Sequence, residues 1–251
     1  MQKAIAIIPA RYASTRFPGK PLVDIQGKSM IMRVYAQAAK ADLLKNVFVA
    51  TDDRRIYDHV IQHQGQAIMT AAHHNSGTER CLEAFGILVH KKKCTANEII
   101  LNIQGDEPFI EPAQIDALVK LFERPGVNIA SLIKKMSGPE EINNPDCVKV
   151  VATQNLQALY FSRSPIPFIR DLDDEKRFSS GLYFKHIGMY AYRSHVLSEI
   201  CSLQPSPLEK AEKLEQLRWL ENGFSIHLEL TAHESIAIDS PGDLLKVTNI
   251  A

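Results

Sequence analysis

The sequence predicts a single domain with an α/β fold and a mainly parallel central sheet, and two observations support that prediction. Short apolar segments alternate with amphipathic stretches of about ten residues or more through the first hundred positions. This alternation is typical of βαβ units, whose right-handed crossovers bring the carboxyl ends of the strands to one edge of the sheet. The length of 251 residues, without a Pro/Gly/Ser-rich linker, then indicates a single domain over 1–251 with an inserted subregion.

The expected elements follow in order along the chain. The segment 3–8 is apolar and rich in isoleucine, which predicts a strand buried on both faces, and Pro9 ends its pairing. Further strands are expected at 46–51, 66–70, 98–103, 148–152, 158–161, 188–193, 226–230 and 235–238. Helices are expected at 29–41, 54–64, 78–92 and 207–221 and after Pro241. A Pro- and charge-rich excursion at 164–180 predicts a flap or interface segment beside the main sheet.

Composition limits the function classes. With 29 basic and 29 acidic residues, the net charge favours neither nucleic acid nor an anionic membrane, so anion binding must come from local clusters. The four cysteines are widely separated and have no metal-ligand spacing, which predicts reduced core thiols. No basic leader and no apolar run of about 20 residues is present, so a cytoplasmic protein without membrane contact is expected.

The loop after the first strand is strongly cationic. Arg11, Arg16 and Lys20 fall within ten residues, and Ser14 and Gly19 add a hydroxyl and a flexible backbone. Ligands of open α/β sheets bind beyond the carboxyl ends of the strands, so this loop predicts a site for a nucleoside triphosphate. It matches neither the Walker pattern nor a Gly-x-Gly-x-x-Gly turn, so side chains would do most of the binding. The alternative is a solvated basic turn.

Two carboxylates are candidates for the same edge. Asp106 follows the strand at 98–103, and Asp239 follows the one expected at 235–238. Magnesium takes one or two protein carboxylates together with substrate phosphates, so the pair and the cationic loop predict metal-assisted phosphoryl transfer. The alternatives are a Gly-Asp turn for Asp106 and a helix cap for Asp239, in place of a capping box made by Ser240 and Asp243.

Two further segments have the pattern of helix N-termini. Ser76 with Glu79, and Ser206 with Glu209, have the spacing of capping boxes, which predicts structural roles for both glutamates. Ser76 would also lie where free backbone N–H groups favour a base carbonyl or a phosphate. The histidines at 73–74 are interpreted as loop surface, because no third metal ligand stands at a recognisable spacing.

Taken together, several phrases in order resemble the 3-deoxy-manno-octulosonate cytidylyltransferases, also called CMP-Kdo synthetases, over nearly the whole chain. The phrases are IIPARYASTRFPGKPL at 7–22, SGTER at 76–80, QGDEP at 104–108, YFSR at 160–163, HIGMY at 186–190, QPSPLE at 204–209, LEQLR at 214–218 and IDSP at 238–241. The first phrase alone would fit a wider set of sugar nucleotidyltransferases.

The resemblance implies a Rossmann-like nucleotidyltransferase fold and transfer of CMP from CTP to the anomeric hydroxyl of 3-deoxy-D-manno-octulosonate (Kdo). Pyrophosphate would leave, Mg²⁺ would assist, and the product would serve lipopolysaccharide synthesis. A homodimer is expected through an inserted, sugar-binding subregion at about 155–195. The alternatives are a cytidylyltransferase for 8-amino-Kdo or a sialic-acid-like sugar, and a catalytically silent nucleotide-binding module.

The resemblance also implies residue roles. CTP would be held by Arg11, Ser14, Arg16, Lys20, Ser76, Arg80 and Gln104. Magnesium would be held by Asp106 and Asp239, which with Lys20 and Arg16 form the expected catalytic set. Kdo would be surrounded by Arg163, His186, Tyr190, Glu215 and Gln216. Without the resemblance, a solvated helix face is the default for Glu215 and Gln216, and partial burial explains the other three.

Overall fold

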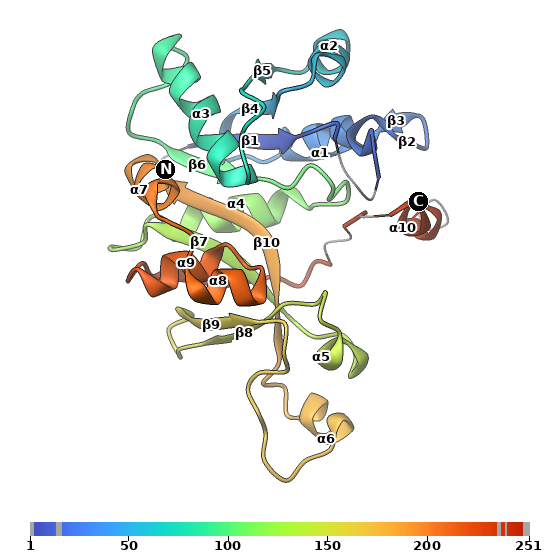
Figure 1. Ribbon diagram of the computed structural model, residues 1–251, viewed down its shortest axis with the longest axis vertical. Helices are drawn as coiled ribbons and strands as arrows, with labels where there is room; N and C mark the ends of the chain where they lie inside the picture. Colours follow the sequence, from blue (N-terminus) through green and yellow to red (C-terminus); the bar gives the residue numbers. More distant parts are fainter. Residues whose placement is uncertain (1–2, 14–16, 235–236, 239, 248–251) are drawn as a thin grey trace.

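A nine-stranded sheet organises the chain in the computed structural model, which describes residues 3–13, 17–234, 237–238 and 240–247 (Figure 1). Its strands are β1 (Ala4–Ala10), β4 (Leu44–Thr51), β5 (Ala67–Met69), β6 (Ile99–Asn102), β7 (Ile129–Lys135), β8 (Lys149–Ala152), β9 (Ala158–Ser162), β10 (Phe184–Arg193) and β11 (Ile226–Leu230). A separate hairpin pairs β2 (Asp24–Ile25) with β3 (Lys28–Ser29).

The helices lie between these strands along the chain, and the last helix follows β11. They are η1 (Lys20–Leu22), α1 (Met30–Ala38), α2 (Arg54–Gln62), α3 (Gly77–His90), α4 (Pro112–Leu121), α5 (Glu140–Asn143), α6 (Asp174–Ser179), α7 (Ser194–Ser202), α8 (Pro207–Glu212), α9 (Gln216–Glu221) and α10 (Pro241–Val247).

The sheet order explains how strand ends converge. The main path runs β11-β7-β10-β6-β1-β4-β5, and β8 and β9 extend it from β10. Pairing is parallel between β6, β1, β4 and β5 and between β11 and β7, whereas β10 runs antiparallel to β6, β7 and β8. Ile7 of β1 lies opposite Phe48 of β4 and Asn102 of β6, so these three strands end at one edge. The predicted α/β class with a mainly parallel sheet is confirmed.

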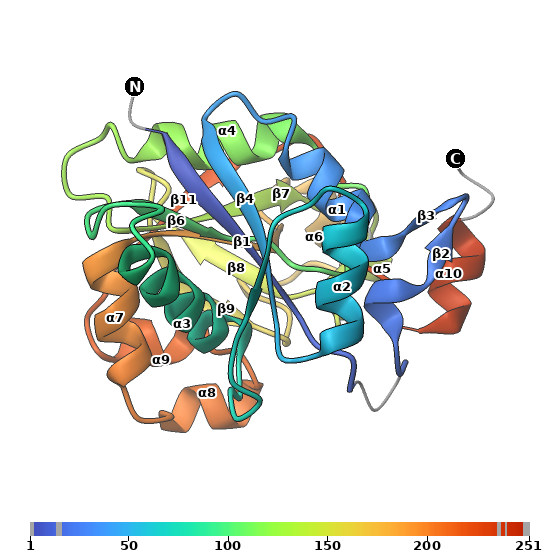
Figure 2. The same cartoon turned by 90° about the horizontal axis from the view of Figure 1, so that it is seen from above.

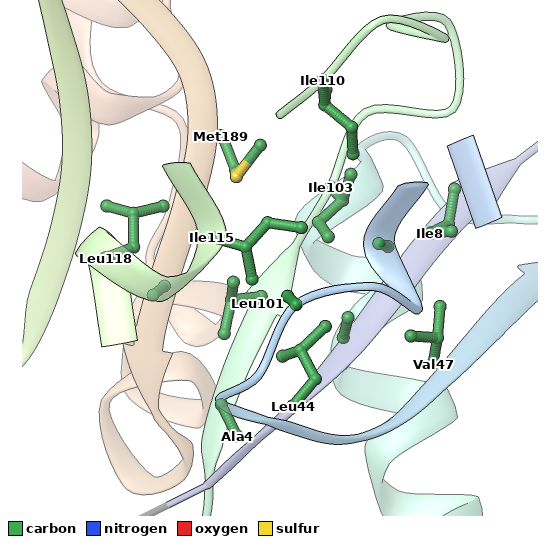
Figure 3. Close-up of a cluster of buried hydrophobic side chains, with 14 of the residues drawn as sticks. Ala4, Ile8, Leu44, Val47, Leu101, Ile103, Ile110, Ile115, Leu118 and Met189 are labelled. Carbon is green, nitrogen blue, oxygen red and sulfur yellow. The ribbon is translucent and has the colours of Figure 1, made fainter. Parts of the chain in front are cut away.

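Alternating side chains of β1 supply two hydrophobic layers. Ala4, Ala6 and Ile8 pack into one cluster with residues of α1 and α4, and Figure 3 shows part of it. Ile5 and Ile7 pack into the other with residues of α3, α7 and α9. Figure 2 shows these two groups of helices on opposite sides of the sheet. Full burial of each isoleucine stabilises the fold by roughly 1.5–3 kcal/mol, so β1 contributes to the stability of both hydrophobic layers.

The structure corrects four expectations about individual elements. Pro9 does not end the pairing of the first strand, because β1 continues to Ala10 and pairs with β4 up to Thr51. The helix expected at 207–221 is two helices, α8 and α9, because Lys213 between them adopts a left-handed φ of 56°. The strand expected at 235–238 falls partly outside the described residues, and 237–238 are not in a strand. β10 begins at Phe184, not Gly188, because Phe184 already pairs with Lys135 and Val150.

The C-terminal segment returns to the region of the cationic loop. Ile238 packs with Ile25 and Met30, and Leu244 of α10 and Phe17 pack against this small cluster. Figures 1 and 2 show α10 close to the hairpin of β2 and β3. Within the described parts of the chain, every helix is too short or too polar to cross a bilayer.

Candidate active site

A cleft of about 360 Å³ opens at the edge where β1 and β6 end. Its wall is formed by Pro9, Ala10, Arg11, Lys20, Pro21, His74, Asn75, Ser76, Gly77, Arg80, Gln104, Gly105 and Asp106. The wall therefore contains Asp106 and five of the seven side chains expected to hold a nucleotide. The other two, Ser14 and Arg16, lie outside the described residues, as does Asp239.

Two glycines allow the cleft wall to close around Pro9. A Cβ atom at Gly105 would lie 3.0 Å from the carbonyl oxygen of Pro9, and one at Gly77 would lie 3.1 Å from its Cγ. Contacts this short are tighter than nearly all Cβ contacts in proteins, so the neighbouring atoms of Pro9 would have to move by a few tenths of an ångström. Glycine at both positions lets the end of β6 and the start of α3 approach the end of β1.

An ion pair joins the cationic loop to the loop after β6. Nζ of Lys20 lies 2.7 Å from Oδ2 of Asp106, and the two side chains are 14% and 28% exposed. Gly19 has a left-handed φ of 73°, and its N–H donates to the carbonyl of Tyr12 at 3.0 Å. This turn presents Lys20 at the start of η1. The predicted juxtaposition of Lys20 and Asp106 is thus present.

The cationic loop is braced by an aromatic contact that sequence analysis does not predict. The guanidinium carbon of Arg55 lies 3.3 Å from the ring centroid of Tyr12, and Arg55 also pairs with Asp53 at 2.6 Å. Asp53 caps α2 by accepting from the N–H of Arg55. The sequence gives no signal for this contact, because Arg55 lies in the first turn of α2, far from Tyr12 along the chain.

Arg80 is a fixed part of the cleft wall. Only 4% of the residue is exposed, and Nη1 donates to Oγ1 of Thr70 at 2.7 Å and to the carbonyl of Ala71 at 3.3 Å. The same nitrogen lies 3.3 Å from Oδ1 of Asp52, at the end of β4. Charge-assisted contacts of this kind hold a guanidinium in one orientation. The guanidinium of Arg80 is therefore held in a fixed orientation in the cleft wall.

The interpretation of both histidines at 73–74 as loop surface is wrong for one of them. His73 is exposed, but His74 lines the cleft with only 10% of its side chain exposed. Nε2 of His74 is hydrogen-bonded to Oε2 of Glu83, which also accepts from the N–H of Ala71 at 2.9 Å. Burial acts to raise the pKa of Glu83, but the hydrogen bonds outweigh it and leave that pKa below its usual value. His74 thereby ties the loop before α3 to the helix itself.

The histidine and tyrosine expected near the sugar acid lie together on β10. The ring centroids of His186 and Tyr190 are 5.2 Å apart, and Trp219 of α9 packs edge-on to Tyr190 at 5.1 Å. Nε2 of His186 lies 2.8 Å from Oγ of Ser131. Removal from water lowers the pKa of His186 to about 3, so its imidazole is neutral at physiological pH.

Glu215 and Gln216 do not form a solvated helix face. Gln216 is only 6% exposed, and Oε2 of Glu215 accepts from Oγ1 of Thr78 at 2.7 Å. Burial raises the pKa of Glu215, while hydrogen bonds from the Thr78 and Ser76 side chains act in the opposite direction. A second connection runs from Nε2 of Gln104 to the carbonyl of Gly188 at 3.2 Å. The predicted nucleotide and sugar-acid groups are therefore adjacent.

Arg163 follows β9 and is held by the backbone. Its Nε donates to the carbonyl of Glu212 at 2.8 Å, and its Nη1 donates to the carbonyl of Pro145 at 2.8 Å. The carboxylate of Glu212 accepts from Ser162 and from the N–H of Arg163. Arg163 is thus tied to the end of α8, and these hydrogen bonds do not connect it to His186, Tyr190 or Glu215.

The described residues offer one carboxylate at the cleft as a candidate metal ligand. They contain no group of three His, Cys, Asp or Glu side chains arranged to hold a metal ion. Asp106 offers a carboxylate in the cleft wall, and the backbone N–H of Ile238 donates to the carbonyl of Asp106 at 2.9 Å. A single carboxylate suits Mg²⁺, which binds hard oxygen ligands and retains water and substrate oxygens as further ligands.

Comparison with known proteins gives consistent results. Residues 5–231 match the cytidylyltransferase family. The 3-deoxy-manno-octulosonate cytidylyltransferase of Cytophaga hutchinsonii is 50% identical over 246 residues, covering 98% of this chain and 96% of that protein. The protein of the same name from Geobacter sulfurreducens is 49% identical, covering 96% of each chain.

Solved structures agree with the sequence relatives. CMP:2-keto-3-deoxy-manno-octonic acid synthetase complexed with CTP superposes with a TM-score of 0.89 at 41% identity, covering 99% of this chain and 98% of that one. A 4-diphosphocytidyl-2C-methyl-D-erythritol synthase, at a TM-score of 0.65 and 12% identity over 100% and 98% of the two chains, shares the fold. The chain belongs to the 3-deoxy-manno-octulosonate cytidylyltransferase family.

Proposed function

We propose that the protein transfers CMP from CTP to the anomeric hydroxyl of Kdo and releases pyrophosphate. The names of the full-length relatives support this activity, as does the similar structure described as complexed with CTP. The observation that carries the proposal is the cleft itself. Its wall brings together three cationic side chains, Asp106, a helix N-terminus and Gln104 from three distant parts of the sequence.

The cationic side chains would bind the triphosphate. Lys20 would neutralise charge that builds up at the α-phosphorus as the anomeric oxygen attacks in line, while Arg11 and Arg16 would steady the leaving pyrophosphate. Arg80, Ser76 and Gln104 would contact the remainder of the nucleotide. Preorganised donors need no rearrangement during the reaction, so the fixed guanidinium of Arg80 supports this assignment.

Asp106 is the described residue that would hold Mg²⁺, with Asp239 as the second carboxylate. The hydrogen bond from Ile238 to Asp106 supports this pairing, because it ties the residue preceding Asp239 in the sequence to Asp106. When bound, Mg²⁺ would offset phosphate charge and lower the pKa of the sugar hydroxyl, so that no protein base is required. Lys20 would then exchange its contact with Asp106 for one with phosphate.

The sugar acid would lie beside β10 and the start of α9. Tyr190, neutral His186, Glu215 and Gln216 would supply hydrogen bonds to its hydroxyls. A role for Arg163 stays a prediction, because its hydrogen bonds to the carbonyls of Glu212 and Pro145 tie it to the end of α8. A homodimer formed through residues of about 155–195 stays a prediction, and so does a cytoplasmic location.

The test is pyrophosphate release from CTP with a panel of sugar acids that includes Kdo, 8-amino-Kdo and a sialic acid. Kdo is expected to give the highest kcat/KM, and replacing CTP by UTP is expected to lower the rate. Omission of Mg²⁺, with a chelator present, provides the metal control. Preference for another sugar acid would reassign the substrate, and no release with any pair would contradict the enzymatic function.

A further inference from the structure

The N-terminus of α3 contacts both halves of the candidate active site. On one side, Ser76 and Gly77 line the cleft assigned to the nucleotide. On the other, the hydroxyl of Thr78 donates to Oε2 of Glu215 at 2.7 Å, and Ser76 hydrogen-bonds to the same carboxyl. Thr78 and Glu215 are 137 residues apart in sequence. Three consecutive residues therefore join the nucleotide cleft to the start of α9.

Both helices that form this connection, α3 and α9, are anchored in the hydrophobic core. Thr78 is 3% exposed, and the helix that follows it buries Cys81, Ala84 and Phe85 against the sheet. Ser76 caps α3 by accepting from the N–H of Glu79 at 3.2 Å. On the other side, Trp219 and Leu217 anchor α9 in the same hydrophobic cluster. A rigid element with a hydrogen bond at its end transmits small displacements instead of absorbing them.

We propose that Thr78 is a positioning residue that couples the two substrate sites by holding Glu215 against the nucleotide-binding end of α3. The inference rests on the proposed function, and it adds a role for a residue that does not line the cleft. A nucleotide that shifts the Ser76–Gly77 turn would also shift the Thr78 hydroxyl and, through it, Glu215. By thermodynamic linkage, a sugar acid bound at Glu215 would tighten nucleotide binding by the same factor.

The expected size of the coupling follows from the bond that carries it. A hydrogen bond to a charged group changes an equilibrium by about tenfold to a hundredfold when one partner is removed. Because a second connection between the sites, from Gln104 to Gly188, remains, the lower part of this range is expected. Loss of the Thr78 hydroxyl should thus reduce mutual tightening of the substrates by about tenfold.

The experiment is steady-state kinetics in which CTP and Kdo are both varied, so that each substrate's dissociation constant from the binary and ternary complexes is obtained. The ratio of these constants is the coupling factor. Wild-type protein is expected to show a factor well above one. Thr78→Val keeps the shape of the side chain without its hydroxyl, and it should lower the factor by about tenfold while the Gln104–Gly188 connection remains. Thr78→Ser restores the hydroxyl and should restore the coupling.

Two measurements separate this role from a simple loss of fold. Thermal unfolding of Thr78→Val and Thr78→Ser establishes that both are folded at the assay temperature. In a Glu215→Ala background, Thr78→Val should have no additional effect on the KM for Kdo, because its partner is absent. Additive effects in that double variant, or a wild-type coupling factor in Thr78→Val, would overturn the inference. A factor of one in the wild type would do the same, although pyrophosphate release would still support the proposed function.

Discussion

Nζ of Lys20 lies 2.7 Å from Oδ2 of Asp106, although 86 residues separate them in sequence. The pair joins the loop that follows β1 to the loop that follows β6, at the carboxyl edge of the sheet. The ion pair holds both charged groups at the cleft wall, and both side chains remain partly exposed. A triphosphate with a divalent cation would offer each residue a new partner of opposite charge, which makes the pair a direct target for mutation.

Substitution Asp106→Asn should abolish most turnover while leaving the fold intact. The amide has almost the same shape but carries no charge, so affinity for Mg²⁺ falls and the rate should drop on the order of 10²-fold or more. The measurement is pyrophosphate release as Mg²⁺ is titrated, with circular dichroism to verify folding. A rate close to wild type at saturating Mg²⁺ would exclude the metal role of Asp106.

Substitution Lys20→Met should lower kcat more than it raises the KM for CTP. The charge of Lys20 is expected to matter most as negative charge shifts in the transition state, so kcat should fall on the order of 10²-fold. Initial rates over a range of CTP concentrations separate the two effects. If KM alone changed, Lys20 would contribute to binding and not to the chemical step.

Gly105→Ala should destabilise the protein and disturb the cleft. Its new methyl group would lie 3.0 Å from the carbonyl oxygen of Pro9, and overpacking against backbone costs about 1–3 kcal/mol of unfolding free energy. Gly86→Ala is the matched control, because Gly86 is an exposed residue within α3 and a Cβ there would meet no atom within 4 Å. That control should stabilise the protein by about 0.5–1 kcal/mol. Urea denaturation measures both changes, and equal effects of the two substitutions would refute the close-approach argument.

His186 should make the protein less stable at acid pH. Because its folded-state pKa is depressed to about 3 from 6.5, the unfolded chain binds one more proton between these values. Its contribution to stability is therefore complete above pH 6.5 and is lost as the pH falls toward 3, with a slope of at most about 1.4 kcal/mol per pH unit.

His186→Gln removes that titration but retains a side chain able to hydrogen-bond to Ser131. Unfolding free energies of the two proteins, measured from pH 4 to pH 8, should show a shallower acid decline for the variant. Parallel declines would mean that other groups account for the acid sensitivity.

Local signals in the sequence predicted the helix ends well. The spacing of Ser206 and Glu209 predicted a capping box, and both of its reciprocal hydrogen bonds form. Ser240 and Asp243 likewise bond to each other in both directions at the start of α10. Ser76 caps α3, but the Glu79 carboxylate accepts from Asn75 and not from Ser76. These features are predictable because the interacting groups are three or four residues apart.

Local signals in the sequence do not predict contacts between distant segments. Nothing in the order of residues indicates that Arg55 would stack on Tyr12, that His74 would face the cleft beside Glu83, or that Thr78 would hold Glu215. The break between α8 and α9 was also missed, because the left-handed conformation of Lys213 interrupts a stretch that is otherwise favourable for a helix.

The sequence by itself determined the alternation of strands and helices, the cationic loop after the first strand and the family to which the chain is similar. These properties depend on hydrophobic period, on neighbouring residues and on the order of short motifs. Only the tertiary structure decided which side chains share the cleft and which partner holds each of them, as for Lys20 with Asp106 and Thr78 with Glu215. Such pairs depend on sheet order and strand register, which place the ends of remote segments side by side. Sheet order and register cannot be read from the residues between those segments.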